Sequence, residues 1–126
     1  MEYKNKIIID ITPIGKPRMT RRDKWAKRDC VIRYFEYKDR LNVALRGNFG
    51  ANSLFMPHKI TFYLPMPKSW SIKKKKELEG APHRSKPDID NLLKAIYDSL
   101  LDDDSSVYYV TAVKYWGEKG KIIIEW

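Results

Sequence analysis

Three residue types that build recognisable sites are scarce in this 126-residue chain, which has one cysteine, two histidines and six glycines. The single Cys30 excludes an internal disulfide and fits a reducing compartment, and we expect it to be a small core residue on a helix. Since His58 and His83 are 25 residues apart and Cys30 has no cysteine partner, no zinc-binding pattern is present. Gly15 and Gly50 are isolated, which excludes a glycine-rich phosphate-binding loop.

Long hydrophobic runs are also missing. No apolar stretch approaches the ~20 residues that span a bilayer, and the isoleucine run after residue 6 is too short for a signal-peptide core. We therefore expect a cytoplasmic protein of a bacterial cell with no membrane partner. The length and an apolar content of 43% predict a single globular domain over residues 1–126.

Acidic residues are outnumbered overall but concentrated locally. The chain has 25 Lys and Arg against 16 Asp and Glu, a net charge of +9. Residues 88–104 hold six acidic residues and one basic residue, so they carry −5, while the rest, with 24 basic and 10 acidic residues, carries +14. A basic surface indicates a polyanionic partner, and a concentrated acidic stretch could hold a cation. The combination predicts a metal-using nuclease, although a solvated acidic helix end explains the charge pattern equally well.

Side-chain periodicity predicts four strands, over residues 6–11, 58–64, 107–115 and 121–126, the last two joined by a hairpin at 117–120. In the first strand the isoleucines at 7, 9 and 11 share one face. Residues 12–19 form a basic, turn-rich stretch with two prolines and a glycine.

Three helices are predicted between these strands. The first begins near Arg21, after a capping-box spacing from Thr20 to Asp23, and ends at Gly47. Its expected buried stripe is Val31, Tyr34, Phe35, Leu41 and Leu45. A short helix over 71–79 carries four consecutive lysines, which we interpret as a solvated face that could also follow a DNA arm.

The clearest helical signal lies between Ile89 and Leu101, where apolar residues recur at i, i+3, i+4, i+7, i+8, i+11 and i+12. The element order is then β-α-β-α-α-β-β. We expect an α+β fold with a small mixed β-sheet packed against helices.

The start of this helix carries the residues with the strongest chemical pattern. Pro87 excludes helix at Lys86, so Asp88 and Asp90 lie at the helix entrance, near the positive end of its dipole. Lys94 follows Asp90 by one turn on the same face. Magnesium is commonly held by one or two carboxylates, with water and substrate phosphate completing its shell. The alternative is a purely structural role, in which one aspartate caps the helix and Asp90 forms an exposed ion pair with Lys94. This alternative does not explain the later acidic run at 102–104.

The segment Lys86-Pro-Asp-Ile-Asp-Asn-Leu-Leu-Lys-Ala-Ile-Tyr-Asp-Ser-Leu100, followed by Asp103-Asp-Ser-Ser-Val107, resembles the signature of the RusA-type Holliday junction resolvases. The resemblance extends to Gly15-Lys-Pro-Arg18 and to Lys114, so it covers most of the chain. It implies a homodimer that makes paired, Mg²⁺-dependent cuts in four-way DNA junctions during recombination and repair, without a small-molecule cofactor. Phage and host origins both fit.

The resemblance also implies residue roles. Asp88, Asp90 and Asp104 match the catalytic, metal-binding aspartates, Asp103 their acidic neighbour, and Lys94 the essential lysine. The link from Leu100 to Asp103 is shorter than in several relatives, which leaves the assignment open among residues 102–104. We further expect phosphate contacts from basic residues beside the site: Lys16, Arg18, Arg21, Arg22, His83, Arg84, Lys86 and Lys114.

A geometric question follows from the short link. A straight helix from Asp90 to Leu101 is roughly 17 Å long, which would leave Asp104 far from Asp88. Either the chain folds back sharply after Leu100, or the partner of a dimer completes each site. Two other functions stay open: a metal-dependent nuclease of other branched or single-stranded DNA, and a non-catalytic basic DNA-binding module.

Overall fold

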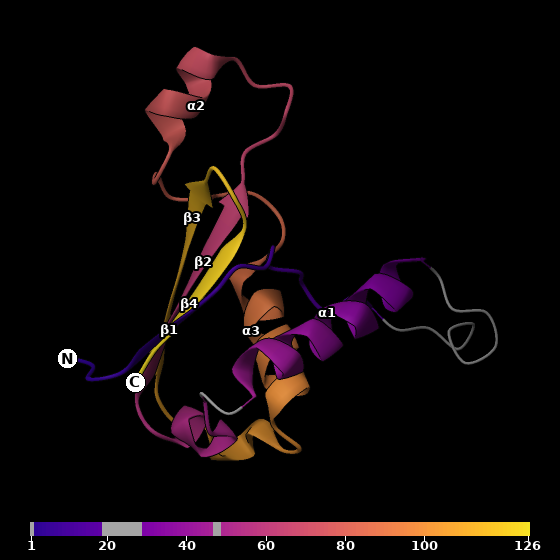
Figure 1. Cartoon of the computed structure of the whole chain (residues 1–126), viewed down its shortest axis with the longest axis vertical. Helices are drawn as coiled ribbons and strands as arrows, with labels where there is room; N and C mark the ends of the chain where they lie inside the picture. The colour runs from indigo at the N-terminus through magenta and orange to yellow at the C-terminus, as the bar shows by residue number, and fades with distance from the viewer. Residues whose placement is uncertain (1, 19–28, 47–48) are drawn as a thin grey trace.

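The computed structural model describes residues 2–18, 29–46 and 49–126 (Figure 1). Its regular elements are, in order, β1 (Lys6–Ile9), α1 (Asp29–Leu45), β2 (His58–Pro65), α2 (Ile72–Leu78), α3 (Ile89–Leu100), β3 (Val110–Gly117) and β4 (Lys121–Glu125). Two 3₁₀ turns, η2 (Ala51–Phe55) and η3 (Asp104–Ser106), precede β2 and β3. This confirms the predicted order and the α+β class with a small mixed sheet.

The strands described here form one sheet in the order β1-β4-β2-β3. β4 pairs antiparallel with both β1 and β2, whereas β2 and β3 run parallel, with His58 opposite Val110 and Pro65 opposite Gly117. A parallel pair needs a long crossover connection, which the segment containing α2 and α3 supplies. β1 is shorter than predicted, and β3 begins three residues later than predicted.

Helices α1 and α3 cover the same face of the sheet (Figure 1). The strands contribute alternate residues to the core between these layers, as the period of two requires. α3 contributes its predicted apolar stripe, in which Leu92, Ala95 and Ile96 are fully buried. The buried hydrophobic residues of the strands are Ile9, Ile60, Phe62, Leu64, Ile122 and Ile124.

Two expectations for α1 are wrong. Tyr37 is buried where Phe35 was expected, because each residue turns the helix by about 100° and Phe35 lies too far around from the stripe, leaving it 41% exposed. Cys30, expected in the core, is exposed because it lies in the first turn of α1, before the first buried residue of the stripe, although it shares the angular position of Tyr34 and Tyr37. The predicted start at Arg21, with the Thr20–Asp23 capping box, lies outside the described residues.

Among the described residues, the helices are all too short or too polar to cross a membrane.

Candidate active site

The loop before α3 is built onto the edge of the sheet. Gly80, with a positive φ of 78°, turns the chain, and its N–H donates to the Trp116 carbonyl. The loop then pairs with β3 as far as His83, whose N–H donates to the carbonyl of Lys114 at 3.0 Å. The path of residues 80–83 is therefore fixed by main-chain hydrogen bonds.

Lys114 holds the rest of this loop. Its Nζ atom donates to the carbonyl oxygens of Ser85 at 2.7 Å and Pro87 at 2.8 Å. Pro87 immediately precedes Asp88, and the Lys86–Pro87 peptide bond is cis. One ammonium group on β3 thus joins the sheet to the start of α3.

Asp88 occupies the N-cap position of α3 without acting as a cap. Its backbone is extended and its carbonyl accepts from the Leu92 N–H at 3.1 Å, but its carboxylate accepts no capping hydrogen bond. The side chain is exposed and makes no ion pair or hydrogen bond with any described residue. The simple capping explanation of Asp88 is therefore not supported, and its carboxylate is available to a ligand.

Asp90 lies in the first turn of α3 and faces Lys94. The Lys94 Nζ atom is 3.7 Å from Asp90 Oδ2, and the two side chains are 61% and 67% exposed. An exposed i,i+4 pair of this kind contributes only about 0.3–0.5 kcal/mol. The pair can therefore open readily when a stronger partner arrives.

The acidic run at 102–104 folds back toward the helix. α3 ends at Leu100, and Leu101 is extended. A polar pocket of about 260 Å³ brings this run together with the side of α3, being lined by Lys16, Lys94, Tyr97, Asp98, Leu101, Asp102, Asp103 and Asp104. The sharp reversal that we considered from the sequence does occur, and Lys94 lies between Asp90 and the acidic run.

The three predicted metal-binding positions are nevertheless not gathered around one point. Within the described part of the chain, no three Asp, Glu, His or Cys side chains are close enough together to hold a metal ion. Asp88 and Asp90 lie at the start of α3, and Asp104 lies beyond its end. Asp103 caps η3, and the hydrogen bond from the Ser105 N–H lowers the pKa of its carboxyl.

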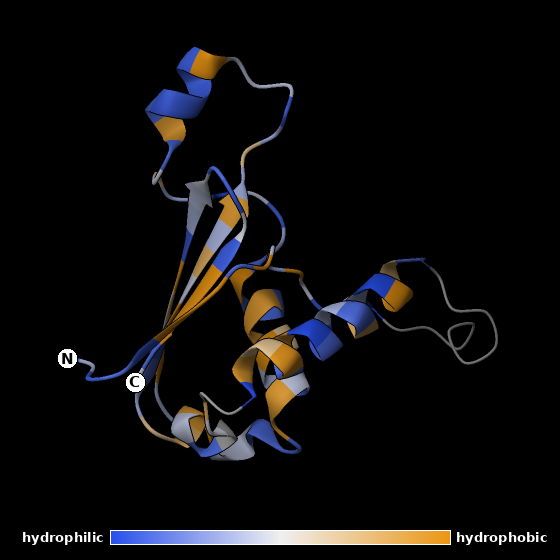
Figure 2. Ribbon diagram, in the orientation of Figure 1, coloured by the Kyte–Doolittle hydropathy of each residue, from blue (hydrophilic) through white to orange (hydrophobic). Residues whose placement is uncertain are grey.

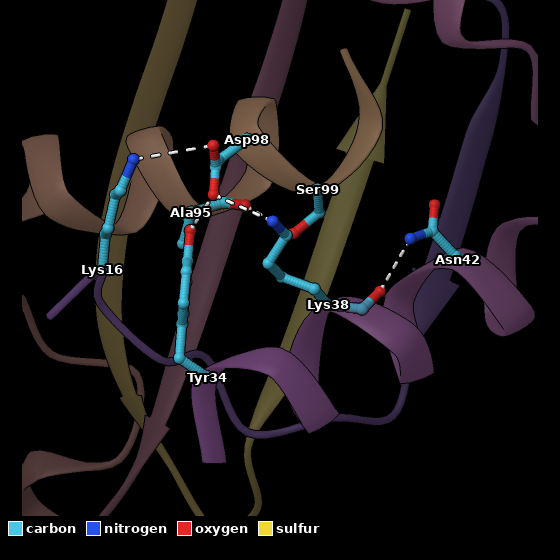
Figure 3. Close-up of polar contacts among 7 residues, drawn as sticks. All are labelled: Lys16, Tyr34, Lys38, Asn42, Ala95, Asp98 and Ser99. Atoms are coloured by element: carbon cyan, nitrogen blue, oxygen red, sulfur yellow. Dashed lines mark hydrogen bonds and ion pairs between the residues drawn. The ribbon is translucent and has the colours of Figure 1, made fainter. Parts of the chain in front are cut away.

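Asp98 is the centre of a polar cluster that sequence reasoning missed (Figure 3). Its carboxylate accepts a 2.6 Å hydrogen bond from the Tyr34 hydroxyl and lies 3.1 Å from Lys38 Nζ and 3.5 Å from Lys16 Nζ. Burial acts to raise the pKa of Asp98, but the hydrogen bonds from Tyr34 and Lys38 and the charges of Lys38 and Lys16 outweigh it, and the pKa is lowered. The ionised carboxylate therefore ties α1 and the basic segment to α3. No local spacing signals these contacts, because the three partners are 60 or more residues away from Asp98 along the sequence.

Gly15 lets the basic segment lie directly against the start of α3. A Cβ atom at Gly15 would be 3.2 Å from Pro87 Cβ and 3.4 Å from Asn91 Cβ. The next residue, Lys16, donates its N–H to the Asn91 carbonyl at 3.3 Å. Gly15 and Lys16 therefore lie directly against the start of the acidic helix.

The other residues predicted to contact DNA differ in their exposure to solvent. Arg18, Arg84 and Lys86 are exposed, and Arg21 and Arg22 lie outside the described residues. His83 is only 5% exposed, with its ring 4.1 Å from that of Trp116. Burial, followed by the charge of Lys114, lowers the pKa of His83, which favours a neutral ring.

A family model described as Endodeoxyribonuclease RusA matches residues 10–125, which is nearly the whole chain. No curated protein matched. The match includes the loop, both acidic segments and strands β2, β3 and β4, so the chain belongs to the RusA endodeoxyribonuclease family.

Proposed function

We propose that this endodeoxyribonuclease resolves four-way (Holliday) DNA junctions by paired, Mg²⁺-dependent hydrolysis of phosphodiesters, in recombination and repair within a bacterial cell. The observation that carries the catalytic part is the uncommitted carboxylate of Asp88, two residues from Asp90 at the start of α3. A non-catalytic DNA-binding module would have no use for two exposed carboxylates beside a phosphate-binding surface, because they would repel the phosphates.

The donors present suit a magnesium ion. Magnesium prefers oxygen ligands and is usually held by one or two carboxylates, with waters and substrate phosphate in the remaining positions. Asp88 and Asp90 would supply these carboxylates, with Asp104 and its neighbour Asp103 as further ligands. When bound, the ion supplies Lewis-acid polarisation of the phosphodiester and lowers the pKa of an attacking water.

Lys94 is proposed to stabilise the charge that develops on the phosphate. Its ammonium group is 61% exposed and held only by the weak pair with Asp90. If a cation were bound by Asp90, the ion pair between Asp90 and Lys94 would be broken. The Lys94 ammonium group would then be free to turn toward the substrate phosphate.

Phosphate contacts are proposed for the cations beside these carboxylates: the half-buried Lys16 and the exposed Arg18, Arg84 and Lys86, together with Arg21 and Arg22 of the segment that follows. We leave His83 out of this set because it is buried and packed on Trp116. Lys114 would act on DNA through the loop whose carbonyls it holds.

A homodimer is proposed to complete each site, because one chain leaves Asp104 apart from Asp88. The sheet face opposite α1 and α3 is uncovered (Figure 1). The strand registers place Ile8, Ile123, Thr61 and Val113 in one row across this face, and Ile8 is 52% exposed. Ile8 is exposed, Ile123 and Val113 are partly exposed, and an exposed apolar patch is typical of a protein contact surface.

The test of the activity is cleavage of a synthetic four-way junction with and without Mg²⁺, beside a flap, a single strand and a linear duplex of the same sequence. Paired symmetric nicks in the junction alone would support resolution; preferential cutting of another substrate would replace it. Asp90→Asn should bind the junction and fail to cut it. Asp39→Asn, which removes an exposed carboxylate from α1, is the matched control and should cut normally.

Site sharing has its own test. Asp88→Asn and Asp104→Asn chains are each expected to be inactive. If a site draws on both protomers, mixing the two chains should regenerate one intact site per mixed dimer and restore single nicks. A mixture as inactive as its components, with dimer exchange verified by a mass tag, would place all ligands in one chain.

A further inference from the structure

A helical arm projects from the end of the sheet, away from α1 and α3. We name residues 66–80, which include α2, the Trp70 arm (Figure 1). Both of its ends are joined to the sheet: the Met66 N–H donates to the Gly117 carbonyl at 3.1 Å, and the Gly80 N–H donates to the Trp116 carbonyl at 2.8 Å. The arm is therefore a fixed projection and contributes no residue to the buried core described above.

Helix α2 does not pack against the hydrophobic core of the described fold. It is seven residues long and none of its residues is buried. Figure 2 shows a largely hydrophilic helix with hydrophobic residues at its two ends. So short a helix is unstable alone in water. Its order comes from the N-cap Ser71, whose hydroxyl accepts from the Lys74 N–H at 3.1 Å, and from its anchoring to the sheet.

The anchor is a stack of aromatic rings. Trp70 packs edge-on against Trp116 of β3, with ring centroids 4.8 Å apart, and Trp116 packs against His83 at 4.1 Å. Lys74 Nζ lies 4.3 Å from the centre of the Trp70 ring, within the range of a cation–π contact. This stack connects the base of the arm to the loop that leads into Asp88.

The charge of the arm is strongly positive. It contains five lysines, at 68 and 73–76, against two glutamates, at 77 and 79. Lys74 is engaged with Trp70 and Lys75 is half-buried, whereas Lys73 and Lys76 are exposed and lie one turn apart on the same side of the helix. Like charges at this spacing destabilise a helix. Lys73 and Lys76 therefore face solvent and cover no part of the described core.

We propose that the Trp70 arm is a second DNA-binding surface, which holds the phosphate backbone of a duplex segment outside the cleavage site. Two observations identify DNA as the occupant: the positive charge of the arm complements the phosphate backbone, and the arm is continuous with the loop that leads to the cleavage site. Residues 81–87, with Arg84 and Lys86 exposed, run directly from the arm to Asp88, so one positive strip joins the arm to the site. The inference rests on DNA being the substrate, as in the proposed function, and does not require a preference for four-way junctions.

The test uses the double variant Lys73→Gln/Lys76→Gln in the full-length protein. Its matched control is Lys4→Gln/Lys6→Gln, which removes the same charge from exposed positions before and in β1, at a distance from the arm (Figure 1). Binding of a 30-base-pair duplex and of a synthetic four-way junction is measured against salt concentration in the presence of EDTA. Each phosphate contact contributes about 0.9 to the slope of log K against log salt concentration. The arm variant should lower that slope by about two and weaken binding, and the control should leave it unchanged.

Cleavage gives a second readout. At saturating protein, single-turnover cutting by the arm variant should match the wild type, while the protein concentration needed for half-maximal rate rises. Trp70→Ala should reproduce the binding loss by releasing the arm, and Trp70→Phe should restore it. Unchanged salt slopes in the lysine variant, or equal losses in the arm and control variants, would overturn the inference. Because binding is measured without a metal, a protein that fails to cut junctions can still support the arm.

Discussion

The Nζ atom of Lys114 lies 2.8 Å from the carbonyl oxygen of Pro87, the residue before Asp88. A second hydrogen bond, 2.7 Å long, joins the same ammonium group to the Ser85 carbonyl. The loop carrying Arg84 and Lys86 and the first carboxylate of α3 are consequently positioned by one side chain of β3. Sequence reasoning had suggested a phosphate contact for this lysine.

Lys114→Met should therefore impair cutting more than DNA binding. The change removes two charged hydrogen bonds from main-chain carbonyls, and we expect a loss of about 2–3 kcal/mol in the free energy of unfolding. Urea denaturation measures that loss, and single-turnover cleavage with saturating protein measures the rate. Lys4→Met, which removes one exposed charge, is the control. A normal rate with weakened DNA binding would instead make Lys114 a direct phosphate contact.

His58 predicts a dependence of stability on pH. It is fully buried, with Nδ1 2.7 Å from the Met56 carbonyl and Nε2 2.8 Å from the Tyr97 hydroxyl. The Nδ1–H must donate to the carbonyl, so Nε2 accepts from Tyr97 in the neutral ring. Burial lowers the pKa of His58 below its ordinary 6.5, although the hydrogen bond to Met56 opposes this.

Since the pKa is lower in the folded than in the unfolded chain, stability is complete above pH 6.5 and is lost as the pH falls through the folded value. The melting temperature should thus decline between pH 7 and pH 5. His58→Gln should be less stable at pH 7 and show a shallower decline. His83→Gln, measured in parallel, separates the contribution of the second histidine, whose pKa is also lowered. An unaltered decline in His58→Gln would contradict the assignment.

Gly120 and Gly50 offer a matched pair of substitutions. A Cβ atom at Gly120 would run into the Cα and side chain of Thr12, where the basic segment begins, whereas a Cβ atom at Gly50 would meet nothing within 4 Å. Gly120→Ala should destabilise the fold by about 1–3 kcal/mol, as overpacking does. Gly50→Ala should change stability by less than about 0.5 kcal/mol. Thermal unfolding of both variants decides the point, and equal effects would refute the close contact.

The parts of the fold that could be predicted are those encoded in local spacing. The stripe of α3 spans three turns without interruption, so its extent was predictable to within a residue or two. α1 was harder, because adjacent aromatic residues at 34 and 35 both suit a core and only the packing direction decides between them. Its buried Tyr37 carries a hydroxyl, which weakened the apolar pattern.

The polar organisation of the site depends on distant parts of the chain. The Tyr34–Asp98 hydrogen bond joins residues 64 apart, and the bonds from Lys114 reach back 27 and 29 residues. Spacing along the sequence carries no information about such pairs. The chain does turn back after Leu100, but this brings the acidic run beside Lys94 and does not gather it with Asp88 and Asp90, so the reversal alone does not assemble the three carboxylates.

The acidic run at 102–104 gives the last prediction, because its members have different surroundings. Asp103 accepts from the Ser105 N–H and fixes the turn η3. Asp104 and Tyr97 line the same polar pocket, and burial, followed by the charge of Asp104, raises the pKa of the Tyr97 hydroxyl to about 12. Asp102 makes no hydrogen bond and no ion pair with the described residues. Asp104→Asn should therefore abolish cutting, whereas Asp102→Asn should retain it.

Junction binding in EDTA should be equal to or slightly tighter than wild type in both variants, because each removes one negative charge near the phosphates. Asp103→Asn should fall between them, since an amide oxygen can still accept from Ser105 and preserve the turn. Single-turnover cleavage over a range of Mg²⁺ concentrations separates the roles: a ligand variant should require more Mg²⁺, and a variant that only perturbs the turn should not. If Asp102→Asn proves to be the inactive variant, the third carboxylate is shifted by two residues, and the shorter link after Leu100 has moved the site along the run.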